Sequence, residues 1–527
     1  MTRFKRFIWN GILITLVSIL IRGVSVSFNV YLSNRVGAVA MGLFTLISTV
    51  YGFSITVATS GIGLATTTLV AEAMGKADEA GARTPPWQNP RVLCTVRRCS
   101  IYALCFSFGS GLILFFFAPL IGGRFLNDPR TVLSLRILAF TLPPIAFSSV
   151  LSGYFIAVRR VYKNALVQTI GHGIRIYTCV LLIGWIGAKD VESACVAVVL
   201  GGAISEGSSF LIQYLLFFLE KRRYKKEKIS YLQGRTIEKK LLRTALPVAF
   251  SAYVRSGLVT VEHMLIPRGL EKVGNSRDQA LASYGILHSM VFPLVLFPSA
   301  ISSSFSGLLV PEIAEATAIN DQERIHRIIR RVYHTVLIFS IGCAGIMLCF
   351  AHELGELFFP KTDAGSYILM IAPLVPVMYL DTSTDSILKG MGEQVYCMGV
   401  NIVDAFLSVI LVWVLLPLFG INGYIVTVYF TEIVNASLSI HRLFSVSGGK
   451  AQWADWIFKP LLSIGLATAV MRYLLRHFDG QVDSFFKLGA HAVLTVILYV
   501  LFLFLFRSLR FKDLFTNREI KPNKIHK

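Results

Sequence analysis

Three arginines lie deep inside long apolar stretches of the sequence, where a charge is costly. They are Arg22, Arg175 and Arg255. A charged side chain at the centre of a bilayer costs roughly 2.5–3.5 kcal/mol even on the most lenient insertion scale. Such a residue therefore faces an ion-pair partner inside the protein or a water-filled cavity that takes an anionic substrate. Arginine suits the second task because it stays charged when desolvated and offers several donors to phosphate oxygens.

Carboxylates accompany the arginines in these stretches. Glu206 is the expected ion-pair partner of Arg175, because the stretches that carry the two residues form a tight hairpin. Direct contact of Arg175 with a substrate is the alternative. His172 is expected to pack and to form hydrogen bonds rather than to relay protons. Arg22 either contacts a substrate or forms a structural ion pair.

The second half of the sequence carries a further set of charges. Arg255 and Glu262 are seven residues apart, which is two helical turns, and so share one helix face. Arg255 either completes a cationic site with Arg22 or links neighbouring helices. Four more carboxylates follow, namely Asp381, Asp385, Asp404 and Glu432. This group either binds Na⁺ or H⁺ and couples an ion gradient to transport, or caps helices and bonds Asn401 and Asn435.

The composition is that of a protein that crosses a membrane many times. Of the 527 residues, 54% are hydrophobic and 15% are charged, against roughly a quarter charged in soluble domains. The first apolar stretch, Ile8 to Leu32, is too long for the apolar core of a secretory signal and is charged near its middle. We therefore expect a polytopic membrane protein whose first stretch is a membrane span.

The formal net charge of +21 is concentrated in alternate loops. Basic residues gather at the N-terminus, in the central segment Lys221 to Lys240 and in the tail from Arg507 to Lys527. By the positive-inside rule these parts are cytoplasmic, so both termini are expected on the cytoplasmic side of the membrane. This distribution favours contact with anionic lipid head groups over a nucleic-acid site.

Apolar runs of membrane length predict an all-α fold with about fourteen transmembrane helices. The expected spans are residues 8–32, 40–68, 98–121, 132–158, 164–187, 191–219, 242–266, 281–309, 333–359, 366–389, 395–419, 422–443, 457–477 and 486–507. An even number places both termini on one side, as the charge pattern requires. The fifth and sixth spans, and the eleventh and twelfth, are joined by very short turns and so form tight hairpins.

The basic segment 220–240 divides the spans into two sets. We expect a first lobe at residues 1–219, a second lobe at 241–443, and two further helices with a basic cytoplasmic tail at 444–527. The motif Leu69-Val70-Ala71-Glu72 recurs as Leu309-Val310-Pro311-Glu312, at an offset of 240 residues. Two pseudo-symmetric six-helix lobes in the same orientation are typical of a transporter with a central cavity between the lobes.

No constellation for catalysis or cofactor binding is visible in the sequence. The longest internal extracytoplasmic loop, Arg268 to Ala280, holds no set of nucleophile, acid, base and metal ligands. The eight cysteines show no CxxC spacing and are interpreted as small apolar packing residues. We therefore expect a protein that is not an enzyme and that needs no cofactor apart from a coupling Na⁺ or H⁺.

Three long segments resemble one family of transporters. They are MVFPLVLFPSAISSSFSGLLVPEIAEA within Leu265 to Ala316, RILAFTLPPIAFSSVLSGYFIAVRRVYKNALVQ from Arg136 to Gln168, and YLDTSTDSILKGMGEQVYCMGVNIVDAFLSVILVWVLLP from Tyr379 to Pro417. The chain resembles the stage V sporulation protein B group of polysaccharide transporters. That group lies in the superfamily that also holds the lipid II flippases and the multidrug and toxin exporters. The resemblance covers nearly the whole chain.

The resemblance implies both a fold and a substrate class. It implies two six-helix lobes around a V-shaped cavity, two extra C-terminal helices, and transfer of an undecaprenyl-diphosphate-linked saccharide from the inner to the outer leaflet. The saccharide would serve peptidoglycan, surface polysaccharide or spore synthesis. Arg22 lies in a Ser-x-x-x-Arg-Gly context similar to that of a first-helix cavity arginine in the lipid II flippases.

This chain departs from the related families at two places. Spans 40–68 and 281–309 contain no Lys or Arg, whereas the lipid II flippases carry arginines in their second and eighth helices. Related sequences often have a glutamate four residues before Arg175, where this chain has Gly171. These differences leave the identity of the saccharide open.

Two other functions stay open from the sequence alone. A cation-coupled multidrug antiporter has the same architecture, but it favours an acidic, aromatic-lined cavity rather than buried arginines. A scaffold that keeps the fold and recruits cell-wall synthesis enzymes is the third class, and its function would not depend on the buried arginines.

Overall fold

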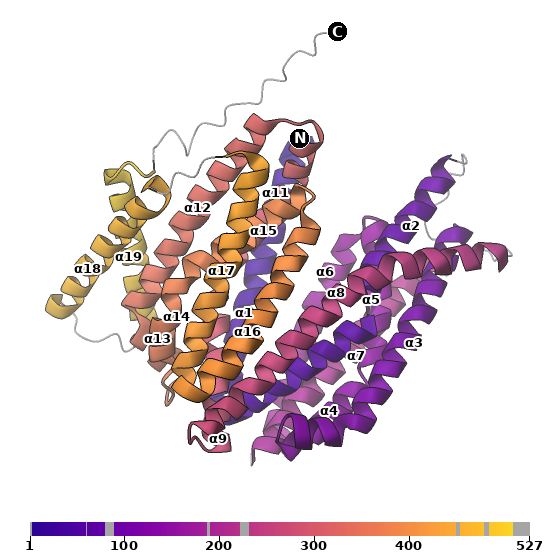
Figure 1. The fold of residues 1–527 in the computed structure, drawn as a ribbon, viewed down its shortest axis with the longest axis horizontal. Coiled ribbons are helices and arrows are strands. Elements are labelled where there is room, and N and C mark those ends of the chain that lie inside the picture. The colour runs from indigo at the N-terminus through magenta and orange to yellow at the C-terminus, as the bar shows by residue number, and fades with distance from the viewer. Residues whose placement is uncertain are drawn as a thin grey trace, which may run out of the picture. The chain divides into compact units, whose positions relative to one another are not determined.

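Nearly all of the described chain is helical (Figure 1). The structure is a computed structural model, and it describes residues 3–59, 61–79, 89–186, 190–221, 231–449, 454–478 and 484–509. Every element in these ranges is a helix, which confirms the predicted all-α fold. Ten of the described helices are long and apolar enough to cross a membrane, or eleven when one bent pair is counted as a single span. The chain is therefore a multi-pass membrane protein, and the number fourteen stays a prediction.

The contacts divide the chain into two compact units. The first unit contains Leu20–Pro293 and Met398–Thr431, and the second unit contains Met1–Ile19, Leu294–Cys397 and Glu432–Lys527. These units do not coincide with the lobes that we expect at residues 1–219 and 241–443, and those lobes stay a prediction. Each unit is described by itself below.

The first unit holds the N-terminal helices and parts of two later ones. Its elements are α1 (Arg3–Thr59) from Leu20 onward, α2 (Ile62–Glu79), α3 (Pro90–Leu120), η2 (Ile121–Phe125), η3 (Pro129–Thr131), α4 (Val132–Ala139), α5 (Leu142–Ala157), α6 (Val161–Ile186), α7 (Val191–Lys221), α8 (Tyr231–Lys272), α9 (Arg277–Gly285), η4 (Ile286–Val291), most of α16 (Gln394–Phe419) and the start of α17 (Ile421–Ser447).

The second unit holds most of the remaining helices. Its elements are the end of α10 (Phe292–Leu296), α11 (Ser299–Ala318), α12 (Gln322–Cys349), α13 (Ala351–Phe358), α14 (Ala364–Ile371), η5 (Ala372–Leu374), α15 (Val375–Gly390), the second half of α17, η6 (Ala454–Phe458), α18 (Lys459–Phe478) and α19 (Phe485–Leu505).

Two glycines interrupt the first helices. Gly37 breaks the regular geometry inside α1 with φ 84° and ψ 166°, and Gly61, with φ 69°, separates α1 from α2. Glycine adopts positive φ without the steric cost of a Cβ atom. The break at Gly37 falls between the first two predicted spans, so these spans meet at a kink rather than in a loop.

The predicted hairpin between the fifth and sixth spans is confirmed as α6 and α7. Thr178 Oγ1 donates to the Gly201 carbonyl over 3.1 Å, and Ser205 Oγ donates to the Gly171 carbonyl over 2.8 Å. A Cβ atom on Gly201 would overlap Cys179 Sγ. Small residues on both helices therefore let the two backbones approach closely, as is common inside membranes.

Helix α5 crosses α2 at an equally close contact in the same unit. A Cβ atom on Gly153 would lie 2.6 Å from the Gly63 carbonyl oxygen, and Thr67 Oγ1 donates to the Gly153 carbonyl over 3.3 Å. Apolar side chains of α2, α3 and α5, among them Tyr154 and Phe155, form a buried core beside this crossing. This core holds α2 and α5 in place next to the α6–α7 hairpin.

Candidate functional site

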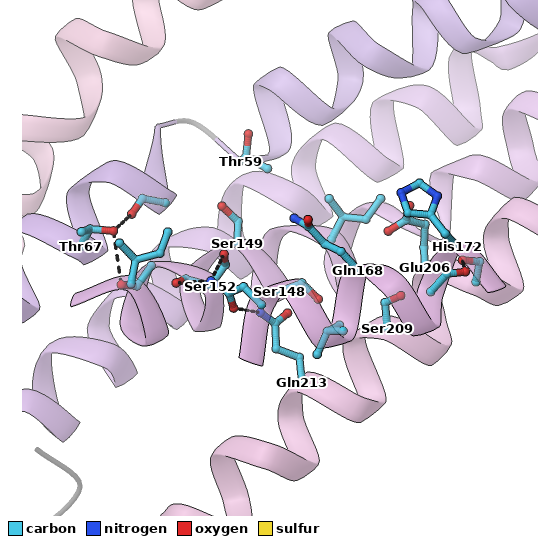
Figure 2. Close-up of a pocket in the computed structure, with 18 of the residues that line it drawn as sticks. Thr59, Thr67, Ser148, Ser149, Ser152, Gln168, His172, Glu206, Ser209 and Gln213 are labelled. Atoms are coloured by element: carbon cyan, nitrogen blue, oxygen red, sulfur yellow. Dashed lines mark hydrogen bonds between the residues drawn. The ribbon is translucent and has the colours of Figure 1, made fainter. Parts of the chain in front are cut away.

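A cavity of about 730 Å³ opens within the first unit, among the end of α1, α2, α5, α6 and α7 (Figure 2). Half of its lining residues carry uncharged hydroxyl or amide side chains. These are Thr59, Thr67, Ser148, Ser149, Ser152, Asn164, Gln168, Ser205, Ser209 and Gln213. His172, Arg175 and Glu206 also line the cavity. The apolar part of the wall comes from Leu64, Ile145, Ile156 and Val167.

The helical repeat explains why so many polar groups meet in one place. Residues three or four positions apart share a helix face, and the polar residues of α5, α6 and α7 follow that spacing. In α7 the polar residues Ser205, Ser209 and Gln213 are four positions apart, and in α6 Asn164, Gln168 and His172 have the same spacing. Each of these otherwise apolar helices therefore turns a polar stripe toward the same cavity, as Figure 2 shows.

One hydrogen-bonded group fixes part of the wall. Asn164 Nδ2 of α6 donates to Ser152 Oγ of α5 over 2.9 Å and to the Ser152 carbonyl over 3.1 Å. Asn164 is buried, so these bonds satisfy an amide that would otherwise be left without partners at a cost. The bonds hold α5 and α6 together beside the hydroxyl groups that line the cavity.

Arg175 and Glu206 line the same cavity but do not form the direct ion pair expected from the sequence. No oxygen of Glu206 lies within 4.0 Å of the Arg175 guanidinium in the described structure, although the charge of Arg175 acts on Glu206. The register of the hairpin explains the separation. Because Ser205 bonds the Gly171 carbonyl and the two helices are antiparallel, Glu206 lies about level with Ile170, more than one helical turn from Arg175.

The guanidinium of Arg175 retains unused donor capacity. Its Nε is buried and has no hydrogen-bond partner within the described part of the chain. A buried donor without a partner is costly. Arg175 also lines the cavity, so it offers a fixed positive charge beside the hydroxyl and amide groups.

Arg22 lies outside this cavity, in the part of α1 that precedes the kink. Its side chain is half-buried and has no ion-pair partner among the residues whose side chains the structure describes. The side chains of residues 3–19 lie outside that description. Both interpretations of Arg22, substrate contact and structural ion pair, therefore stay predictions.

Arg255 and Glu262 lie on α8 beside α16. Arg255 is exposed, and its charge acts on Asp404 of α16. Glu262 lies two helical turns further along α8. This arrangement supports a link between neighbouring helices for Arg255. The described structure shows no contact between Arg255 and Arg22.

The other predicted carboxylates lie in the second unit and have structural partners. Asp381 Oδ2 accepts a hydrogen bond from Asn435 Nδ2 over 3.1 Å, which is one of the two interpretations drawn from the sequence. Asp385 forms an ion pair with Lys389 over 3.1 Å. Glu432 is half-buried on α17. Asp404 belongs to the first unit, so these four carboxylates do not form one cluster within a unit.

Most residues that line the cavity were not predicted from the sequence, because they are uncharged. The hydroxyl and amide residues of α5, α6 and α7 are individually unremarkable in an apolar helix, where they often bond the carbonyl four residues earlier. The available signal was their recurrence at intervals of three and four residues in three consecutive spans. Among the described residues, no group of three or more His, Cys, Asp or Glu side chains is arranged to hold a metal ion.

Comparison with known proteins assigns the chain to a family. Residues 7–317 match the family model described as polysaccharide biosynthesis protein, which is more than half of the sequence. The chain belongs to the polysaccharide biosynthesis protein family. A second family model, MatE, matches residues 272–414. This membership confirms the resemblance that the sequence segments carry.

Relatives and solved structures agree with this family. Stage V sporulation protein B of Bacillus subtilis is 23% identical over 398 residues, which is 75% of each chain. The lipid II flippase MurJ in an inward closed conformation has the same fold, with a TM-score of 0.68, 14% identity, and coverage of 94% of this chain and 99% of that one. An inward-facing multidrug resistance MATE family transporter has a TM-score of 0.62 at 15% identity, covering 83% of this chain and 100% of that one. The chain therefore shares its fold with these two transporters.

Proposed function

We propose that this protein moves a polyprenyl-diphosphate-linked saccharide across the bacterial plasma membrane by alternating access. The observation that carries the proposal is the cavity of the first unit, where hydroxyl and amide groups line the wall together with the charged side chain of Arg175. A lipid-linked saccharide has a sugar head that needs polar contacts and a diphosphate that needs a cation. The cavity offers both kinds of contact in a volume within the usual range of ligand sites, about 300–1,000 Å³.

The family and its relatives support the same proposal. Family membership links the chain to polysaccharide biosynthesis, and the relative from Bacillus subtilis is a sporulation protein. The fold is shared with a lipid II flippase. We further propose that both termini are cytoplasmic, that anionic lipids contact the basic loops, and that the protein works beside enzymes of cell-wall synthesis.

The test is lipid flipping in proteoliposomes with a fluorescent undecaprenyl-diphosphate saccharide. Arg175→Gln keeps a polar side chain that can form hydrogen bonds, although a shorter one, and removes the charge. Hydrogen bonds to charged groups contribute about 1.5–3 kcal/mol, so we expect flipping to fall by about ten- to a hundredfold. The matched control is Arg327→Gln, because Arg327 is an exposed arginine of α12, and it should flip at the wild-type rate.

Two results would overturn the proposal. One is folded wild-type protein that flips none of several such lipids. The other is an Arg175→Gln variant that flips as fast as the Arg327→Gln control at matched reconstitution. Either result would refute the proposed role of the cavity, and the first would also refute the proposed transport of lipid-linked saccharides.

A cation-coupled drug antiporter is the second candidate. It is favoured by Glu206, a carboxylate that lines the same cavity, and by the match of residues 272–414 to the MatE model. The two functions differ in which charge matters. An antiporter for cationic drugs loses activity in Glu206→Gln and keeps it in Arg175→Gln, whereas a flippase for an anionic lipid shows the reverse.

A further inference from the structure

Two short turns of this chain have the same backbone structure. They are residues 158–160, which we call the α5–α6 turn, and residues 391–393, which we call the α15–α16 turn. The second residue of each turn adopts a positive φ, which is 59° at Arg159 and 86° at Gly392. The third residue of each turn donates its amide to the carbonyl five residues earlier, over 2.8 Å from Arg160 and 2.9 Å from Glu393. This arrangement is a common end of an α-helix.

The side chains of the two turns differ in charge. The α5–α6 turn and the start of α6 carry three cations at positions where the α15–α16 turn and the start of α16 carry none. The cations are Arg159, Arg160 and Lys163, and the equivalent residues are Gly392, Glu393 and Tyr396. Glycine is the residue that a positive φ favours. The shared backbone structure therefore needs none of the three cations and does not explain them.

One carboxylate bonds two of these cations. Arg160 Nη1 and Lys163 Nζ both donate to Oε1 of Glu220, at the end of α7. The side chains of Glu220 and Lys163 are only 9% and 12% exposed, and buried charges need counter-charges. At the α15–α16 turn, by contrast, Glu393 pairs with a single cation, Arg442, over 2.9 Å. The three cations of the α5–α6 turn and α6 exceed the single charge of Glu220 by two.

The α5–α6 turn lies at one end of the polar cavity. Ile156 and Asn164, on either side of the turn in the sequence, both line the cavity. Asn164 directly follows Lys163, and its amide donates to Ser152 Oγ over 2.9 Å. The basic segment 220–240 begins at Glu220, so the turn and this segment lie on the same side of the membrane. In the orientation proposed above, this end of the cavity is cytoplasmic.

We propose that the α5–α6 turn is the loading site for the diphosphate of the lipid-linked saccharide. Arg159, Arg160 and Lys163 bind the phosphate oxygens, and the sugar enters the cavity beside them. Arginine and lysine are the side chains that bind phosphate groups through charge-assisted hydrogen bonds. The identity of this ligand rests on the proposed function, whereas the excess of positive charge does not.

The charge at the turn favours a diphosphate over an ordinary lipid phosphate. A diphosphate that joins a lipid to a sugar carries two negative charges, and these match the excess of two positive charges at the α5–α6 turn. The phosphate of an anionic phospholipid such as phosphatidylglycerol carries one. The hydroxyl and amide groups of the adjoining cavity wall also have no use for a phospholipid acyl chain.

The position of the turn makes it the first of two contacts for the diphosphate. Lys163 and Arg175 are twelve residues apart on α6, which is about 18 Å along an α-helix. The hydrocarbon core of a bilayer is about 30 Å thick. A diphosphate bound at the turn therefore lies at the level of the inner-leaflet head groups, and it reaches Arg175 only after it has moved toward the middle of the membrane.

Binding is tested by native mass spectrometry of the purified protein in detergent with undecaprenyl diphosphate, which carries no sugar. Lys163→Gln removes one cation and should weaken binding by about tenfold or more, because hydrogen bonds between charged groups are the strong ones. The matched control is Lys389→Gln, because Lys389 pairs with Asp385 over 3.1 Å just before the α15–α16 turn. This control should bind undecaprenyl diphosphate as wild type does.

A second variant, Arg159→Gly, separates binding from stability. Glycine favours the positive φ at this position, so the variant should be at least as stable as wild type to unfolding by SDS while it binds undecaprenyl diphosphate several-fold more weakly. The matched control is Arg507→Gly, because Arg507 is also an exposed arginine at positive φ, 55°, after α19. It should keep both stability and binding. A cation that served only the fold would give the reverse result for Arg159→Gly, namely lower stability and unchanged binding.

Two results would overturn the loading site. One is equal binding of undecaprenyl diphosphate by Lys163→Gln, Arg159→Gly and their two controls. The other is wild-type protein that binds phosphatidylglycerol as tightly as undecaprenyl diphosphate, because the turn would then be a general site for anionic lipids.

Neither result depends on flipping, so failure of the loading site is distinguishable from failure of the proposed function. Wild-type protein that binds undecaprenyl diphosphate through Arg159 and Lys163 but flips no lipid-linked saccharide would refute the proposed function and retain the binding site.

Discussion

Asp128 joins two segments that are far apart in the sequence, and removal of its charge tests how much this junction contributes to the stability of the fold. The segment 121–131, which contains η2 and η3, contacts the segment 268–278 within the first unit. The Asp128 side chain is only 2% exposed. It accepts hydrogen bonds from Arg130 Nε over 2.9 Å and from Arg130 Nη2 over 2.8 Å, and Arg277 Nε lies 3.6 Å from the same carboxylate.

The substitution Asp128→Asn keeps the shape of the side chain and removes its charge. One carboxylate oxygen becomes an amide NH₂ group that faces the Arg130 or Arg277 donors. Two charge-assisted hydrogen bonds contribute about 3–6 kcal/mol together, and breaking a buried ion pair by removing one partner costs about 3–5 kcal/mol. We therefore expect the free energy of unfolding to fall by about 3–5 kcal/mol, or roughly a hundred- to a few-thousandfold in the equilibrium constant.

The assay is reversible unfolding in mixed micelles of detergent and SDS, followed by helical circular dichroism. The matched control is Asp278→Asn, whose side chain is 59% exposed and accepts one bond from Arg130 Nη2 over 2.8 Å. A pair this exposed contributes about 0–1 kcal/mol. If Asp128→Asn loses no more stability than Asp278→Asn, the reasoning from burial and bidentate geometry is wrong.

Two further predictions concern other parts of the chain. Gly285→Val should lower the free energy of unfolding by about 1–3 kcal/mol through overpacking against α1, as measured by the same unfolding assay. Gly52→Val is the control and should lower it less, because no atom lies within 4 Å of a Cβ placed on Gly52. Asp381→Asn should leave any Na⁺ dependence of flipping unchanged, because Asn435 bonds its carboxylate. Loss of Na⁺ dependence in that variant would instead assign Asp381 to ion coupling.

Much of the fold could be predicted because long runs of apolar residues identify membrane helices. The hairpin of α6 and α7 follows from the short connection between two such spans. The kink at Gly37 was not predicted, because an apolar run does not show where a helix bends. The division into two units could not be predicted either, since it depends on which helices pack together after folding.

The candidate site shows where sequence reasoning ends. Arg175 and Glu206 were correctly assigned to neighbouring helices, but a shift of one helical turn decides whether they touch, and the connection between the helices sets that shift. The ring centroids of His263 and His288 are 4.6 Å apart, yet the two residues belong to different helices and nothing local to either one shows that the rings meet. The polar stripes of α5, α6 and α7 are periodic in the sequence, yet only packing shows that they face one cavity.

The contacts at Asp128 and the packing of α1 on α9 share one physical consequence. Both join segments that precede the basic segment 220–240 to segments that follow it: residues 121–131 bond residues 268–278, and α1 packs on α9. The proposed alternating access would separate such segments, which would break the bond from Arg130 to Asp278 and the bond from Arg277 Nη2 to the Leu126 carbonyl. A ligand shifts this equilibrium only by its difference in affinity for the two states. These bonds therefore set part of the free energy that a bound substrate must offset before the segments separate.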